Sequence, residues 1–171
     1  SSVTHATPAA FYAHVNNRYK EKEIASQLQS SNINIAFGGG LNFFDLNVNN
    51  EQIKYIYELD ELNNINTSSS KRIIGLFDND GIRRASFRPS QQLMTKKALD
   101  ILSKRTAKCS GFFLMTEGSQ IDWASHDNDA SRMIIEFRDF DLSIKTAVEF
   151  INARDDTLLI VTADHETGGL Q

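Results

Sequence analysis

The sequence has 171 residues, of which 40% are hydrophobic and 23% are charged, and its formal net charge is −4 at pH 7. This length and composition predict a single globular domain over residues 1–171 with a core of its own. The acidic balance argues against a nucleic-acid-binding surface, and no apolar run approaches the roughly 20 residues that a membrane span requires. The single cysteine, Cys109, can form no disulfide within the chain and is interpreted as an incidental thiol.

The first half of the chain alternates helical and strand-like patterns. A proline in the position of a first helical turn predicts a helix over residues 9–15, and apolar residues at helical spacing predict another over 21–29. Residues 33–37 and 72–77 are short apolar runs with β-branched residues, which predicts two strands. Apolar residues at 53, 56 and 59 give a weak helical signal.

The second half continues the alternation. Residues 90–104 predict a helix with an apolar inner face, while the apolar runs at 112–115 and 158–162 predict two buried strands. Residues 131–154 carry the clearest helical period in the chain, and their apolar stripe is interpreted as core. Helices and strands in alternation predict an α/β fold with a mainly parallel sheet and helices on both faces. Functional residues are then expected at the carboxyl ends of the strands.

Two turns resemble ligand-binding motifs but lack essential parts. Three glycines at 38–40 follow the first predicted strand, but no Lys-Ser/Thr pair completes a phosphate-binding P-loop, so a tight turn is the favoured interpretation. The DNDG sequence at 78–81 lacks the further carboxylates and the closing glutamate of an EF-hand. Neither turn is therefore a predicted ligand site.

Carboxylates and histidines follow both strands predicted in the second half. Asp122 and His126 are four residues apart, so on a helix they share one face. Asp164 and His165 directly follow the last predicted strand. One such pair alone is more often a surface or capping element, but two pairs at the same edge of one sheet favour a metal site. Carboxylate oxygens and imidazole nitrogens suit zinc or a similar divalent ion, and such ions serve phosphoryl transfer well.

Three segments, in this order and at these separations, resemble the alkaline phosphatases, and the resemblance spans essentially the whole chain. They are HATPA at 5–9 followed by Arg18, TEGSQID at 116–122 followed by His126, and TADHETGG at 162–169. Each segment alone is a weak signal, whereas the three together are highly specific. The resemblance implies the three-layer α/β/α phosphatase fold, here incomplete, and the hydrolysis of phosphate monoesters through a phosphoserine intermediate.

The resemblance also implies two Zn²⁺ ions and one Mg²⁺ ion in each active site of the full-length protein. The implied ligands are Asp122 and His126 for the first zinc, Asp164 and His165 for the second zinc, and Thr7 and Glu117 for the magnesium.

Three further residues are implied to act on the substrate side of the site. Arg18 matches the arginine that holds the substrate phosphate. His5 and Trp123 stand where family members differ, since some carry Asp and Lys there. The His and Trp pair resembles the branch found in certain marine and cold-living bacteria, and both residues are expected to tune the site without binding an ion directly.

Some parts of the family pattern do not occur in the sequence. The family's nucleophile is a serine in an Asp-Ser-Ala context, and no Asp-Ser dipeptide occurs among the 171 residues. The aspartate that bridges two metals would precede residue 1, and no Gly-Gly-His supplies the last zinc ligand. These differences predict an internal fragment of a longer phosphatase, with little or no activity and weak zinc binding when isolated.

Two alternatives stay open. A related phosphodiesterase, sulfatase or phosphomutase would share the metal ligands, and a catalytically inactive domain would keep the fold without the chemistry. The residues of the second and third segments favour an alkaline phosphatase over the related enzymes, whereas the inactive domain would be favoured if the 171 residues were the entire natural protein. The resemblance further implies phosphate monoester substrates, a homodimer as is common in the family, and a periplasmic or secreted location, although no signal-peptide pattern occurs in the sequence.

Overall fold

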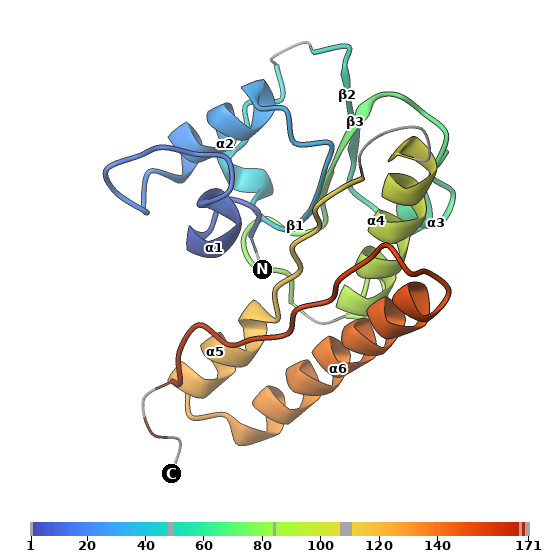
Figure 1. The fold of residues 1–171 in the computed structure, drawn as a ribbon. Helices are drawn as coiled ribbons and strands as arrows, with labels where there is room; N and C mark the ends of the chain where they lie inside the picture. Colours follow the sequence, from blue (N-terminus) through green and yellow to red (C-terminus); the bar gives the residue numbers. More distant parts are fainter. Residues whose placement is uncertain (1, 48–49, 84, 107–110, 168, 170–171) are drawn as a thin grey trace. The chain divides into compact units, whose positions relative to one another are not determined.

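A three-stranded parallel sheet organises the first half of the chain, as the computed structural model shows (Figure 1). The strands are β1 (Ile35–Gly38), β2 (Ile53–Ile56) and β3 (Arg72–Leu76). Their order is β1-β3-β2, with β3 in the centre and parallel to both neighbours. Ile35 is in register with Ile73 on one side of β3. The observed parallel sheet, together with its helices, confirms the predicted α/β class.

The structure describes residues 2–47, 50–83, 85–106, 111–167 and 169. These residues form two compact units, Ser1–Pro89 (unit 1) and Ser90–Gln171 (unit 2). The single domain expected over residues 1–171 stays a prediction. Cys109, interpreted from the sequence as an incidental thiol, lies outside the described residues.

The core of unit 1 lies between the sheet and one helix. Unit 1 contains α1 (Ala6–Ala9), α2 (Glu21–Ser30), the 3₁₀ helix η1 (Leu41–Phe43) and α3 (Leu59–Asn63). Side chains from α2 pack with side chains from β2 and β3 because α2 turns its apolar face to the sheet. The buried residues of this core cluster are Val3, Ala25, Leu28, Phe44, Ile53, Ile74 and Leu76.

Arg72 at the start of β3 fixes the end of α2. Its guanidinium Nη2 donates to the carbonyl oxygen of Leu28 at 2.6 Å, and Nη1 donates to that of Gln29 at 2.8 Å. Its Nε donates to the carbonyl oxygen of Ile33, ahead of β1, at 2.8 Å. The last carbonyl groups of a helix have no partners within the helix, so the planar Arg72 fork satisfies groups that would otherwise need water.

Two sequence-based expectations in unit 1 are wrong. The residues predicted as a weak helix at 53–59 form β2, followed by the separate short helix α3. The residues of β2, Ile-Lys-Tyr-Ile, favour a strand by their β-branched and aromatic side chains, and the spacing of its two buried isoleucines imitates a helical period. The helix expected over 9–15 is limited to α1, because the backbone N–H and C=O of His14 bond to the Gln27 side chain on α2.

The described residues of unit 2 form three helices. These are α4 (Gln91–Thr106), α5 (Ser119–His126) and α6 (Ala130–Asn152), and both α4 and α5 pack against α6. The helices predicted over 90–104 and 131–154 are thereby confirmed, to within a few residues at their ends. No helix within the described ranges is long and apolar enough to cross a membrane.

A buried carboxylate on α6 caps the N-terminal end of α4. Asp139 on α6 is 8% exposed, and its two oxygens accept the backbone N–H groups of Gln91 (2.9 Å) and Gln92 (3.4 Å) in the first turn of α4. The hydroxyl of Ser90 accepts the next N–H, from Leu93, at 3.1 Å. Because the N-terminus of a helix carries partial positive charge, the Asp139 carboxylate is well placed there.

The sequence predicts that the apolar stripe of α6 belongs to the core, and this prediction is wrong. Phe137 is 55% exposed, and the other members of the stripe are half-buried or exposed. The face that α6 does bury contains Asp139 and Ser143, one helical turn apart, because the cap interaction with α4 sets the orientation of the helix.

The prediction of two buried strands in the second half of the chain is also wrong. Residues 112–115 and 158–162 are extended, but neither stretch takes part in a β-ladder with the described residues. Phe113 is 74% exposed, and Leu158 and Ile160 are 81% and 74% exposed. A strand requires a hydrogen-bonding partner as well as an apolar pattern, and the pattern alone cannot show whether a partner is present.

Candidate functional site

Helix α5 presents the first predicted pair of metal ligands on one face. Asp122 and His126 lie one turn apart, with Asp122 Oδ1 3.4 Å from His126 Nε2. The Asp122 side chain is 35% exposed and that of His126 is 68% exposed, so both can be reached from solvent. A Cβ on Gly118, the residue before α5, would lie 2.9 Å from Ile121 Cδ1 and 3.0 Å from the Phe140 ring. A larger residue at position 118 would therefore require the Ile121 and Phe140 side chains to shift where α5 begins against α6.

Glu117 lies at the end of the extended segment that leads into α5. The preceding residue, Thr116, is held by α4, because its Oγ1 accepts from Gln91 Nε2 at 3.2 Å and lies 3.2 Å from Thr95 Oγ1. Glu117 itself is half-buried. The backbone at Glu117 is thus placed between Thr116, which is bonded to α4, and the start of α5.

The second predicted pair lies near the carboxyl end of unit 2. Asp164 Oδ2 is 3.5 Å from His165 Nε2. His165 Nδ1 lies 2.6 Å from the carbonyl oxygen of Glu166, which can only accept, so Nδ1 carries a proton. That hydrogen bond, and after it the charge of Asp164, raises the pKa of the His165 imidazole. The charge of Asp122 acts in the same direction, which places the second pair within electrostatic reach of the first.

A residue without a predicted role connects the first pair to the segment that carries the second. The Thr167 hydroxyl donates to Asp122 Oδ1 at 2.7 Å, between positions 45 residues apart in the chain. Thr167 is half-buried, whereas the residues from 160 to 166 are exposed. Sequence reasoning included Thr167 in the third segment but gave it no role. Its hydroxyl, three residues beyond an expected ligand, was the available signal.

The donor groups of the two pairs fit a zinc-type ion, but they do not form a closed cage. Each pair offers one carboxylate and one imidazole, the ligand types that zinc prefers. Among the residues that the structure describes, no group of three or more His, Cys, Asp or Glu side chains is arranged to hold a metal. Each pair is therefore half of a tetrahedral set, and the assignment of these residues as ligands stays a prediction.

The other predicted site residues lie in both units. In unit 1, Ser2 pairs with Gly39 in a parallel bridge just beyond β1, so α1, with His5 at its N-cap and Thr7 within it, begins near the carboxyl end of that strand. Arg18 is exposed in the same unit. Trp123 is half-buried on α5 in unit 2. The grouping of these residues into one site stays a prediction.

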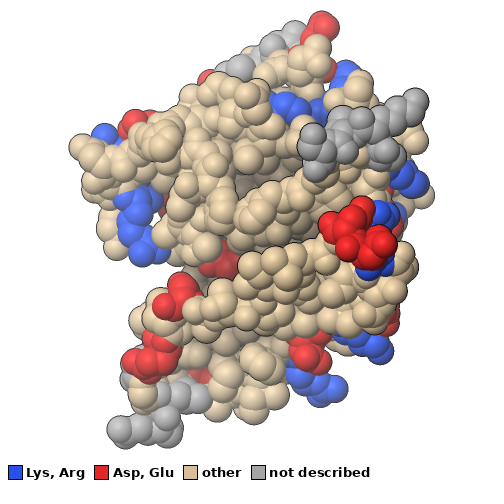
Figure 2. Space-filling model, in the orientation of Figure 1, with Lys and Arg blue, Asp and Glu red and all other residues tan. Residues whose placement is uncertain are grey.

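Arg18 has little fixed structure around its charge. Its Cζ lies 6.0 Å from the centre of the Tyr19 ring, and Tyr19 is itself 80% exposed. On the face shown in Figure 2, Lys and Arg side chains occur in small separate groups between uncharged areas.

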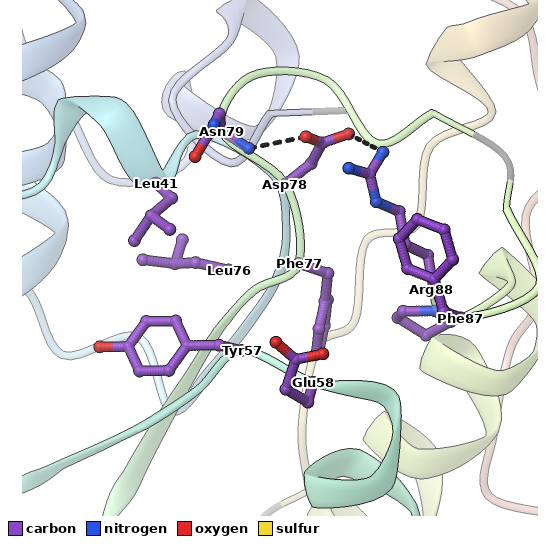
Figure 3. Close-up of a pocket in the computed structure, with 10 residues that line it drawn as sticks. Leu41, Tyr57, Glu58, Leu76, Phe77, Asp78, Asn79, Phe87 and Arg88 are labelled. Atoms are coloured by element: carbon purple, nitrogen blue, oxygen red, sulfur yellow. Dashed lines mark hydrogen bonds and ion pairs between the residues drawn. The ribbon is translucent and has the colours of Figure 1, made fainter.

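A pocket of about 200 Å³ in unit 1 contains none of the predicted site residues (Figure 3). It lies beyond the carboxyl ends of β2 and β3, where Tyr57, Glu58 and Asp78 line it. Asp78 is fully engaged, since its carboxylate accepts from the backbone N–H groups of Asn79 and Arg83 and from Arg88 Nη1. The carboxylate therefore stabilises the 78–81 turn, in agreement with the interpretation of that sequence as a turn.

Comparison with known proteins identifies close relatives. The family model for alkaline phosphatase matches residues 37–171. Alkaline phosphatases 4 and 3 of Bacillus subtilis are 38% and 36% identical over 99% of this chain, which spans 39% of the length of each.

Solved structures of alkaline phosphatases also resemble this chain. The alkaline phosphatase of the Antarctic bacterium TAB5 is 40% identical and superimposes with a TM-score of 0.86, over 99% of this chain and 52% of the other. A cold-active alkaline phosphatase from Shewanella is 34% identical with a TM-score of 0.88, over 98% of this chain and 42% of the other. A variant of the TAB5 enzyme, 37% identical with a TM-score of 0.82, was solved with Mg bound in a site called M3.

Proposed function

Since the chain belongs to the alkaline phosphatase family, we propose that it forms part of a metal-dependent hydrolase of phosphate monoesters. The observation that carries the proposal is that two carboxylate–imidazole pairs, Asp122 with His126 and Asp164 with His165, lie in one unit. Thr167, from the segment of the second pair, donates a hydrogen bond to Asp122 of the first. The relatives named above are all alkaline phosphatases, which favours phosphate monoesters over the diesters and sulfates of related enzymes.

The proposed site holds two Zn²⁺ ions and one Mg²⁺ ion. Asp122 and His126 would bind the first zinc, Asp164 and His165 the second, and Thr7 and Glu117 the magnesium. The donor chemistry supports this division, because imidazole and carboxylate suit zinc while hydroxyl and carboxylate oxygens suit magnesium. The Mg reported in the M3 site of the TAB5 variant supports a magnesium site in this fold. When bound, such ions polarise the phosphoryl oxygens and neutralise charge on the attacking and leaving oxygens.

The chain's own side chains prepare the site in two ways. The hydrogen bond from His165 Nδ1 to the Glu166 carbonyl oxygen leaves the Nε2 lone pair of the neutral imidazole available as a ligand. The exposed guanidinium of Arg18 can bind two phosphate oxygens at once through its planar fork. His5 and Trp123 would tune the surroundings of the substrate.

The covalent step of the proposed reaction belongs to a serine outside these 171 residues. Its oxygen would form a bond to phosphorus as the alcohol oxygen of the ester leaves, and water would then hydrolyse the phosphoserine. The family relationship also supports a homodimer and a periplasmic or secreted location, which we include in the proposal.

A comparison of substrates and metals in the complete protein tests the proposal. The purified protein should hydrolyse p-nitrophenyl phosphate well above bis-p-nitrophenyl phosphate and p-nitrophenyl sulfate, lose this activity to a chelator, and regain it with Zn²⁺ and Mg²⁺. Asp122→Asn and Asp164→Asn should each lower kcat/KM by about 100-fold or more, because each removes a charged ligand.

Asp155→Asn provides the matched control. It removes the same charge from an exposed position in the segment that leads to Asp164 and should leave kcat/KM unchanged within about twofold. A protein that prefers the diester or the sulfate, or whose phosphatase activity survives both Asp122→Asn and complete metal removal, would contradict the proposed function.

A further inference from the structure

The hydrogen bond between Thr167 and Asp122 joins two parts of unit 2 at the proposed metal site. Its length of 2.7 Å is that of a strong bond from a hydroxyl to a carboxylate. Asp122 comes from α5, which packs against α6, whereas Thr167 comes from the segment after α6, whose described residues form no helix or strand. The bond therefore ties a loosely held segment to a firmly held helix.

The bond also restricts the Asp122 side chain itself. A carboxylate group turns easily about its last torsion, which has broad minima. Because Oδ1 accepts from Thr167 and lies 3.4 Å from His126 Nε2, the plane of the carboxylate is set by two neighbours. The second oxygen, Oδ2, keeps its full capacity to bind a cation.

The same bond acts on the second pair of predicted ligands. His165 is two residues before Thr167, and its Nδ1 is held by the Glu166 carbonyl oxygen. Fixing Thr167 on α5 therefore shortens the range over which His165 and Asp164 can move relative to Asp122. One neutral hydroxyl therefore contributes to the local order of both pairs.

We propose that Thr167 is a positioning residue that orients the Asp122 carboxylate and holds the segment of Asp164 and His165 beside α5, thereby raising metal affinity. This inference rests on the proposed function, because it takes Asp122 as a metal ligand. Partners that hydrogen-bond to metal ligands typically contribute about 10- to 100-fold to affinity or activity. A hydroxyl at position 167 suffices for the role, whereas its methyl group does not contribute to it.

Three variants of the complete protein isolate the hydroxyl. Thr167→Val replaces it with a methyl group, and Thr167→Ser keeps it. Thr157→Val is the matched control, because Thr157 makes the same kind of bond, at 2.9 Å to Asp156 Oδ1, in the same segment but away from the predicted ligands. Metal affinity is measured directly by competition for Zn²⁺ with a chromogenic chelator, and the ligand field by the absorption spectrum of bound Co²⁺.

We expect Thr167→Val to weaken Zn²⁺ binding by about 10- to 100-fold and to change the Co²⁺ spectrum. Thr167→Ser and Thr157→Val should stay within about threefold of the unmodified protein, since neither removes a hydrogen bond to a ligand. In an Asp122→Ala background, which removes the acceptor of the bond, Thr167→Val should have less than about a twofold further effect, because the two residues act through one hydrogen bond.

The outcomes separate this inference from the proposed function. Unchanged affinity in Thr167→Val, equal losses in Thr167→Ser and Thr167→Val, or a full effect of Thr167→Val in the Asp122→Ala background would each overturn the positioning role. If Asp122→Asn alone leaves both Zn²⁺ affinity and phosphatase activity intact, the proposed function itself fails. Thermal unfolding in excess chelator identifies any variant that has lost its fold, and Thr167→Ser then decides whether the hydroxyl is the cause.

Discussion

Replacement of Asp139 tests how far one buried carboxylate stabilises unit 2. Its oxygens accept the first two backbone N–H groups of α4, at 2.9 and 3.4 Å. Loss of a capping side chain costs about 0.5–2 kcal/mol, and a partly buried charge at a helix N-terminus contributes up to about 2 kcal/mol. Because the longer bond is weak, we expect Asp139→Ala to lower the free energy of unfolding by about 2–3 kcal/mol.

The assay is urea unfolding followed by circular dichroism, with a thermal scan beside it. For a chain of this size, a loss of 2–3 kcal/mol corresponds to about 4–12 °C in Tm. Asp139→Asn keeps one acceptor oxygen and should lose about 1 kcal/mol. Asp141→Ala, which removes the same charge from an exposed position two residues along α6, should stay within about 0.5 kcal/mol. Equal effects of Asp139→Ala and Asp141→Ala would refute the capping argument.

Two further predictions concern unit 1 and the isolated chain. Arg72→Met should cost about 3–4 kcal/mol in urea unfolding, since three carbonyl oxygens lose a charged donor. Arg72→Lys should recover at most half of this loss, because a point charge cannot reproduce the fork, and full recovery would show that charge alone matters. The purified 171-residue chain should turn over p-nitrophenyl phosphate at or near the uncatalysed rate, because the proposed serine nucleophile is not among its residues; appreciable turnover would disprove this.

The sequence predicts the fold best where a pattern is long. The apolar period of α6 and the inner face of α4 identify both helices almost to their ends. Short patterns fail, because the four residues of β2 hold two isoleucines at a spacing that also suits a helix. The burial of α6 could not be predicted, since a polar tertiary contact of Asp139 determines which face is covered.

For the candidate site, the sequence identifies residue types but not their mutual arrangement. The four-residue spacing of Asp122 and His126 places them on one face of α5, as expected. The approach of Thr167 to Asp122 across 45 positions could not be predicted, because it depends on the path of a segment without regular structure. Hydrogen bonds of this kind depend on the tertiary structure, which the periodicity of a local sequence does not reveal.

The exposed run at 158–161 has a consequence for the solubility of the isolated chain. Leu158, Ile160 and Val161 are more than half exposed, and the run has the β-propensity and lack of charge of an aggregation-prone segment. Asp155 and Asp156 precede the run and Asp164 follows it. Repulsion between these negative charges on neighbouring molecules opposes pairing of their exposed runs as strands. Asp164 is thus one of the acidic residues that flank the run, and neutralising it leaves Glu166 as the nearest negative charge on the carboxyl side.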